Sequence, residues 1–257
     1  MVDLFEEVEE QLRSDRYKTL AFKVLPWIGA ALAAALVAAL AFWGWQTYTA
    51  RANAKASEQY AEALEAFGQG RNDEAFRIWG EVAKSPSKGY QSLALMQQGG
   101  IRQAAGKIDE AVKLYDAAAE AAPTPLIQDA ARLKSALALL DTAPYSAMET
   151  RLKPLLEDGR PYRVQAREAQ AFAKLMNGDT AGARGDFVVL SLLSDASDSA
   201  RQRANAAIQL IDSGGAKAIP AAVKAAAALP PMPTLPMGAA PPAAGAPAPQ
   251  QPAPGSQ

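Results

Sequence analysis

Three stretches with one common spacing decide the fold: GRNDEAFRIW from Gly70, GKIDEAVKLY from Gly106 and GDTAGARGDF from Gly178. The first two glycines lie 36 residues apart, and the second and third lie twice that distance apart. The register point between them is Thr142, which opens the degenerate stretch TAPYSAMETR, and one further step reaches Gly214. A fixed period of this length is typical of a protein built from repeated supersecondary units.

Three further positions keep the same register. Alanine stands five residues after the first four register points, at Ala75, Ala111, Ala147 and Ala183. Nine residues after these points stand Trp79, Tyr115, Arg151 and Phe187. Seven residues before all five points stand the small residues Ala63, Gly99, Ser135, Ala171 and Ala207. We therefore expect helix hairpins in which a small residue lets the second helix approach, a glycine with φ > 0 makes the turn, and an aromatic ring fills the space between neighbours.

This pattern predicts five helical hairpins, and the third and fifth copies are degenerate. Their predicted bounds are about 57–84, 88–122, 127–157, 162–194 and 199–228. Pro123 ends one unit, because the residue before a proline is disfavoured in a helix. The order of small, Gly, Ala, aromatic and Pro positions resembles the tetratricopeptide repeat (TPR), whose period is 34. An ordinary helical bundle with coincidental glycine turns is the alternative.

A long uncharged stretch precedes the repeats. Residues 24–50 contain no charge and are bracketed by Lys23 and Arg51. About 20 apolar residues cross a hydrocarbon core, so we predict a transmembrane helix over this stretch. Aromatic residues, which favour membrane interfaces, lie near its two ends at Trp27, Phe42, Trp43, Trp45 and Tyr48. The alternatives are a buried alanine-rich core helix and a cleaved signal peptide ending near Ala54.

Basic residues near the span predict its orientation. Four precede it and two follow it closely: Arg13, Arg16, Lys18, Lys23, Arg51 and Lys55. The side with more basic residues is expected in the cytoplasm, which places residues 1–23 there and residues 51–229 outside. In a bacterium this means a single-pass protein of the inner (plasma) membrane with a periplasmic C-terminal domain.

The composition argues against most enzymatic chemistry. The 257 residues include 26 Lys plus Arg, 27 Asp plus Glu, and neither His nor Cys. A net charge near zero disfavours nucleic-acid binding. Without His and Cys the chain lacks the usual general base, thiolate nucleophile and transition-metal ligands. The acidic residues of the repeats have no spacing that indicates an acid–base pair: Glu149, Glu157, Asp158 and Asp179. We expect a protein that is not an enzyme, with no cofactor, metal or small-molecule substrate, whose partners are proteins and the lipid around 24–50.

The two ends of the chain differ from the repeats. In residues 1–23 one face of a predicted helix is apolar and the other acidic, which favours a cytoplasmic protein partner; a solvated juxtamembrane helix is the alternative. The apolar residues of this face are Leu4, Phe5, Val8 and Leu12. Residues 230–257 contain ten Pro and no charge, which predicts a disordered, partly polyproline II tail.

The head, the span and the degenerate repeats together resemble one family. The most specific stretch is FEEVEEQLRSDR, residues 5–16, just before the anchor. Over about residues 3–229 the chain is similar to the bacterial inner-membrane TPR-like proteins that are the ancillary subunit of the Sec translocon. The resemblance implies a periplasmic TPR domain that associates with the translocon and cooperates with a membrane-anchored periplasmic chaperone. The Pro/Ala-rich tail is extra to the family pattern.

A TPR-like array leaves a concave surface lined by the first helices of its hairpins. The residues projected onto this predicted groove are Tyr60, Leu64, Phe67, Leu93, Met96, Arg132, Leu139, Glu168, Phe172, Leu175 and Arg201. A groove of this type can hold a peptide or an amphipathic helix. Two functions are compatible with it. One is a membrane-anchored interaction module that handles exported proteins in a chaperone-like way, and the other is a structural scaffold for cell-envelope assembly or division.

Overall fold

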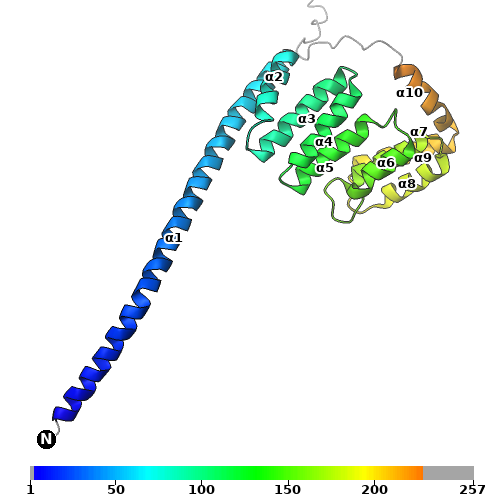
Figure 1. The fold of residues 1–257 in the computed structure, drawn as a ribbon. Coiled ribbons are helices and arrows are strands. Elements are labelled where there is room, and N and C mark those ends of the chain that lie inside the picture. The colour runs from blue at the N-terminus through cyan, green and yellow to red at the C-terminus, as the bar shows by residue number, and fades with distance from the viewer. Residues whose placement is uncertain (1–2, 228–257) are drawn as a thin grey trace, which may run out of the picture. The chain divides into compact units, whose positions relative to one another are not determined.

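The structure, a computed structural model, describes the backbone of residues 3–227 and the side chains of 25 and 27–225. These residues form helices and no strand, which confirms the all-α prediction (Figure 1). The helices are α1 Asp3–Gly68, α2 Asn72–Val82, α3 Lys88–Ala104, α4 Ile108–Ala121, α5 Pro125–Ala138, α6 Tyr145–Leu152, η1 Lys153–Leu155, α7 Arg163–Met176, α8 Thr180–Leu192, α9 Asp198–Asp212, η2 Gly215–Ala218 and α10 Ile219–Ala227. The tail 230–257 and the side chains of the 1–23 head lie outside the described residues, so what was predicted for them stays a prediction.

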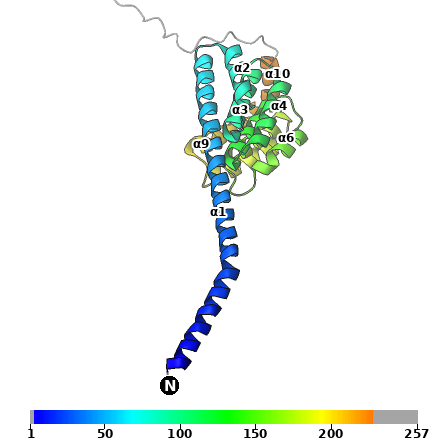
Figure 2. The same cartoon turned by 60° about the vertical axis from the view of Figure 1, so that its left-hand side comes forward.

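From Glu58 onwards the helices pair in chain order into an array of hairpins. The end of α1 pairs with α2, and the next pairs are α3 with α4, α5 with α6, and α7 with α8. In the last unit α9 packs on η2, which also contacts α10. Successive hairpins also contact each other, because α2 packs on α3, α4 on α5, and α8 on α9. Figures 1 and 2 both show α3 lying beside α4. This is the TPR-like arrangement expected from the spacing.

The helix α1 is longer than the hairpin prediction, which starts the first helix near residue 57. It runs without interruption from Asp3 to Gly68. The stretch 46–67 contains neither Gly nor Pro, so no residue in it favours a break in the i→i−4 hydrogen bonds. The helix ends at Gly68, two residues before Gly70.

The glycines at the register points make the turns, as predicted. Gly70, Gly106 and Gly178 have φ of 77°, 72° and 86°, and Gly214 has 79°. At the first turn the N–H of Gly70 donates to Phe67 O at 2.9 Å, and that of Arg71 donates to Ala66 O at 2.9 Å. This pair of bonds is the Schellman motif, in which a left-handed residue lets the next N–H groups satisfy the last carbonyls of the helix.

The buried residues follow the predicted register closely. Trp79, Tyr115 and Phe187 are all inside the core. A Cβ atom added at Gly99 would lie only 2.6 Å from Cε1 of Tyr115, so the ring of Tyr115 rests on the backbone of α3 where any larger residue would push it away. Ala75, Ala111 and Ala183, which lie in the second helices of their hairpins, are likewise fully buried. The small-residue and aromatic positions therefore pack together as expected.

The third hairpin departs from this packing. Its turn takes residues 139–144, because Thr142 stands where the other units have a glycine of positive φ. Ala147, at the register position of Ala111, is only half-buried. Arg151 stands where the others have a buried aromatic ring. The degeneracy read from the sequence is thus a real difference in how this hairpin is built.

Candidate functional site

The predicted groove residues differ widely in exposure. Leu64 and Phe67 are exposed, at 42% and 45%, whereas Leu175 is 2% exposed. The other eight are all half-buried: Tyr60, Leu93, Met96, Arg132, Leu139, Glu168, Phe172 and Arg201. Assigning Leu175 to the groove was wrong, because it packs in one apolar cluster with Phe187 in the last turn of α7 before Gly178.

The apolar groove residues of the first two hairpins come together in the structure. Tyr60, Leu64 and Phe67 lie at i, i+4 and i+7 on one face of α1. The ring centroid of Tyr60 is 5.8 Å from that of Tyr90 on α3, and Leu93 follows Tyr90 one turn later. We call these five residues the aromatic face.

The aromatic face rests on a buried ring. The centroid of Trp79 lies 6.1 Å from Tyr60 and 5.6 Å from Phe67, distances at which tilted rings attract each other. Gln97 donates from Nε2 to the Tyr60 hydroxyl at 2.9 Å. Sequence reasoning missed Tyr90 and Gln97. Tyr90 lies 16 residues before Gly106, whereas Tyr60 lies 10 before Gly70, so the register did not select it.

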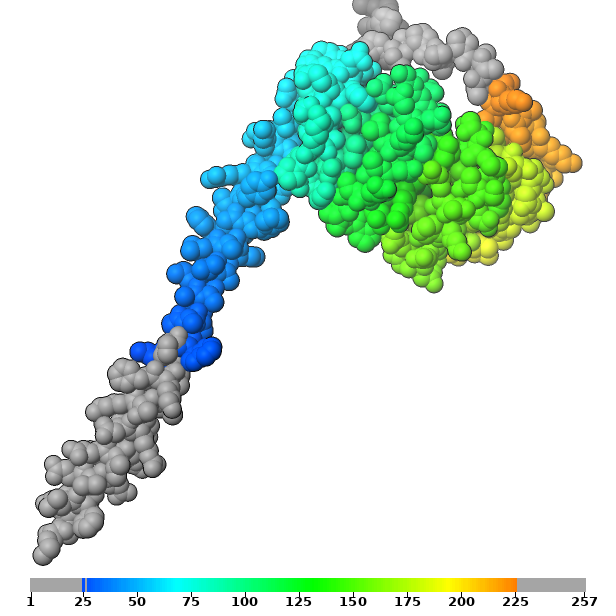
Figure 3. Space-filling model, viewed as in Figure 1, coloured from blue at the N-terminus to red at the C-terminus, as the bar shows by residue number. Residues whose placement is uncertain are grey.

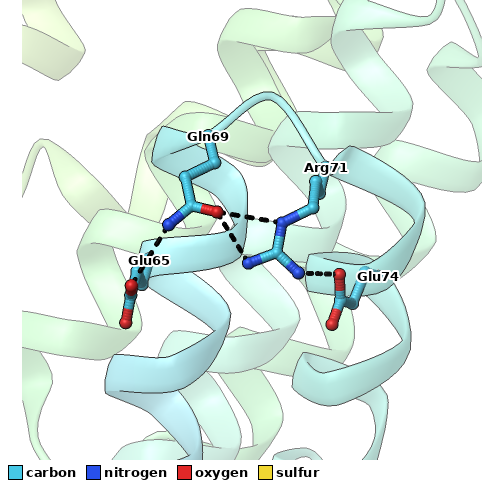
Figure 4. Close-up of polar contacts among 4 residues, drawn as sticks. All are labelled: Glu65, Gln69, Arg71 and Glu74. Atoms are coloured by element: carbon cyan, nitrogen blue, oxygen red, sulfur yellow. Dashed lines mark hydrogen bonds and ion pairs between the residues drawn. The ribbon is translucent and has the colours of Figure 1, made fainter.

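A chain of polar contacts spans the turn between α1 and α2 (Figure 4). Gln69 donates to Glu65 at 3.1 Å, and Arg71 donates from Nη2 to Gln69 Oε1 at 2.8 Å. Arg71 also pairs with Glu74, which links the turn to α2. Because these groups are exposed, each contact contributes little to the free energy of unfolding. They connect the end of α1, close to Phe67 in the sequence, to the start of α2.

A polar network takes the place of the aromatic ring in the third hairpin. Arg151 donates from Nη1 to Asp116 Oδ1 at 3.0 Å and to Ser135 Oγ at 2.9 Å. Ser135 in turn donates to Asp116 Oδ1 at 2.6 Å. Beside this network lies a hollow of about 310 Å³, lined also by Arg132, Glu120 and neighbouring residues. Among the described residues no group of His, Cys, Asp and Glu is placed to hold a metal.

The charged groove residues of the C-terminal half already have partners within the chain. Glu168 accepts from Arg203 Nε at 2.6 Å, and Arg201 donates to Asp198 at 2.8 Å. Further pairs join neighbouring helices or loops. The hydrogen bond from Arg163 lowers the pKa of Asp195, and that from Arg184 lowers the pKa of Asp212.

The segment of α1 that begins at Trp27 is long and apolar enough to cross a membrane. Its most apolar window has a mean hydropathy of 1.9, and none of that window is buried. Trp27 is 79% exposed and Trp45 is 69% exposed. Figure 3 shows the first, blue part of this segment as a rod with side chains that project outwards. A helix from a soluble core would be covered, so the exposure argues against the core-helix alternative; a signal sequence shares the same features.

In a comparison with known protein families, residues 25–224 match the tetratricopeptide repeat-like domain. Comparisons with curated proteins and with solved structures give no significant match. The matched range includes the apolar part of α1 and the hairpins as far as residue 224 in α10. The chain therefore belongs to the tetratricopeptide repeat-like domain family.

Proposed function

We propose that this protein is a membrane-anchored interaction module of the bacterial inner membrane. In this proposal its head is cytoplasmic, α1 spans the membrane once, and the hairpins lie in the periplasm. There the protein associates with the Sec translocon and handles exported proteins in a chaperone-like way. The observation that carries the proposal is one chain with both an exposed apolar helix and a repeat array of a family typical of protein binding.

In this proposal the head and the hairpins, at the two ends of α1, bind different partners. The apolar face of the head is expected to dock a cytoplasmic partner, and its residues are Leu4, Phe5, Val8 and Leu12. The predicted groove residues other than the buried Leu175 are expected to contact clients or a periplasmic chaperone. Translocon association rests on the resemblance of the head and span to the ancillary translocon subunit. Protein binding as such rests on the repeat family.

Within the groove the aromatic face is the best candidate for client contact. Leu64 and Phe67 offer apolar surface to solvent, and Tyr60 and Tyr90 add rings with polar hydroxyls. Rigid aromatic side chains give large contact areas at a low cost in conformational entropy. The charged positions Glu168 and Arg201 are held by intramolecular pairs, so we expect them to contribute less to client binding.

The test is co-purification of the full chain in a mild detergent. Phe5→Ser with Leu12→Ser is expected to weaken recovery of translocon subunits and to leave helix content unchanged. Met96→Glu is expected to spare that association and to reduce crosslinks to periplasmic chaperones or clients. If the wild type recovers envelope-synthesis or division proteins and no translocon subunit, the scaffold function replaces this proposal.

A further inference from the structure

The sequence that follows α10 has a regular pattern of its own. Residues 229–237 read LPPMPTLPM. A polyproline II helix has three residues per turn, so Leu229, Met232 and Leu235 would share one edge of it. Pro230, Pro233 and Pro236 would share the next edge. The segment carries no charge, so in this conformation it would present one continuous apolar edge beside one edge of prolines.

The aromatic face is a suitable surface for such a segment. Proline-rich polyproline II segments dock on surfaces lined by aromatic side chains, and they lose little conformational entropy on binding. Successive residues on one polyproline II edge are about 9 Å apart, and Tyr60 and Phe67 are about 10 Å apart along α1. Leu64 lies between these rings at 42% exposure. The side chains of the apolar edge therefore have nearly the same spacing as the rings of the aromatic face, so the edge can lie along the face.

The geometry points to the 229–237 segment of a second copy of this chain as the occupant of the aromatic face. Leu229 is two residues beyond Ala227, so its Cα stays within about 7 Å of the end of α10. The helix α10 packs against α7 and η2, in the fourth and fifth hairpins. Figure 1 shows α10 and the α1–α2 hairpin at opposite ends of the array. Leu229 of one copy therefore cannot reach the face of the same copy, whereas the segment of a neighbouring copy can lie along it.

This contact joins the C-terminal end of one array to the N-terminal hairpins of the next. Such a head-to-tail contact uses two different surfaces and can propagate from copy to copy. A docked tail would compete with a client for the aromatic face. The contact does not depend on translocon association through the head, so loss of one leaves the other measurable. Loss of self-association would leave the recovery of translocon subunits unchanged.

The first test is photocrosslinking between two forms of the chain in one detergent preparation. One form ends at Ala227 and has the face without the tail, and the other is full-length with a photoreactive amino acid at Met232. We expect crosslinks between the two forms that map to the segments 60–67 and 90–93 of the tailless form. Crosslinks only within the full-length chain, or to other surfaces, would overturn the proposal.

The second test measures binding of a peptide of residues 228–240 to the tailless form by fluorescence anisotropy. Phe67→Ser and Tyr60→Ala are each expected to weaken binding roughly tenfold or more. Leu126→Ser, at an exposed leucine of α5, is the matched control and should stay within about twofold. Circular dichroism checks that each variant keeps its helix content. Equal weakening by all three variants would contradict the proposal.

The register of the peptide provides the remaining control. Replacing Leu229, Met232 and Leu235 by Ser removes the apolar edge and should abolish most of the binding. Replacing Thr234 and Met237 by Ser changes another edge and should have little effect. If both peptides bind alike, the segment does not bind through a polyproline II edge.

Discussion

The second and third hairpins share the same sequence register, but different side chains pack at its positions. The second has a buried aromatic ring, and the third has a polar network. In the second, Tyr115 rests on Gly99 so closely that a Cβ there would lie 2.6 Å from the ring. In the third, Arg151 and Ser135 occupy the corresponding positions and form a network with Asp116. The first contact excludes water, whereas the second leaves Arg151 one-third exposed beside a hollow.

The difference shows what each kind of contact contributes. A buried aromatic ring removes a large apolar area from water and so contributes strongly to the free energy of unfolding. A partly exposed ion pair contributes little, although it satisfies the polar groups involved. We therefore expect the second hairpin to dominate the stability of the array. We expect the third hairpin to tolerate substitutions better. We also expect neighbouring hairpins to separate there first on unfolding.

The largest expected effect is from Tyr115→Ala. Truncating a buried aromatic residue leaves a cavity and typically costs about 3–5 kcal/mol, and the ring here is almost fully buried. Urea unfolding of the full chain in detergent, followed by circular dichroism, measures the change. A loss below about 1 kcal/mol would mean that Tyr115 does not anchor the second hairpin.

Ala111→Trp should come next. Ala111 is fully buried in the second helix of its hairpin, and overpacking such a site typically costs about 1–3 kcal/mol or more. Ala147→Trp is the matched variant, because Ala147 has the same register in the third hairpin and is half-buried. Thermal melting should show a clearly larger shift for Ala111→Trp. Equal shifts would contradict the proposed difference between the hairpins.

Arg151→Ala should have a smaller effect, of at most about 1 kcal/mol. A double-mutant cycle with Asp116→Ala isolates the pair, and we expect a coupling free energy of about 0.2–1 kcal/mol that falls as salt is added. A coupling free energy well above this range would show that the network contributes as much as an aromatic contact.

The smallest expected effect is a loss of stability in acid. Hydrogen bonds from Arg163 and Arg184 lower the pKa values of Asp195 and Asp212 in the folded state. The stabilisation is therefore complete above the unfolded pKa of about 4 and disappears as pH falls through the lower folded value. Melting temperatures from pH 6 downwards should show a modest decline that is weaker in Arg184→Gln. If the melting temperature of Arg184→Gln falls with pH as much as that of the wild type, the Arg184–Asp212 pair does not cause the loss of stability in acid.

The repeat spacing was enough to predict the hairpins, because each signal is local. Gly70, Gly106 and Gly178 mark turns that require positive φ, and the positions of Trp79 and Tyr115 follow from the same period. The continuous helix α1 was missed, because a change from membrane to repeat sequence was taken as a boundary although 46–67 contains no helix breaker. Such a change in environment does not by itself interrupt backbone hydrogen bonds.

The candidate site was harder to predict than the fold. The groove assignment failed at Leu175, whose orientation depends on how α7 packs against α8. Tyr90 was missed because it joins Tyr60 from an irregular position on α3. The partners of Glu168 and Arg201 also depend on tertiary contacts. The repeat register can be predicted from a single sequence. The exposed surface depends on the angles between helices, and the register does not specify these angles.

We propose that α1 anchors the repeats to the outer side of the inner membrane. Protease added to spheroplasts that contain the full chain tests it most directly, when combined with sequencing of the mature N-terminus. We predict that the hairpins are digested, that a fragment containing the apolar part of α1 remains in the membrane, and that the N-terminus is not processed near Lys55. Complete protection of the hairpins would reverse the topology, and a mature chain beginning near Lys55 would show a cleaved signal peptide in place of an anchor.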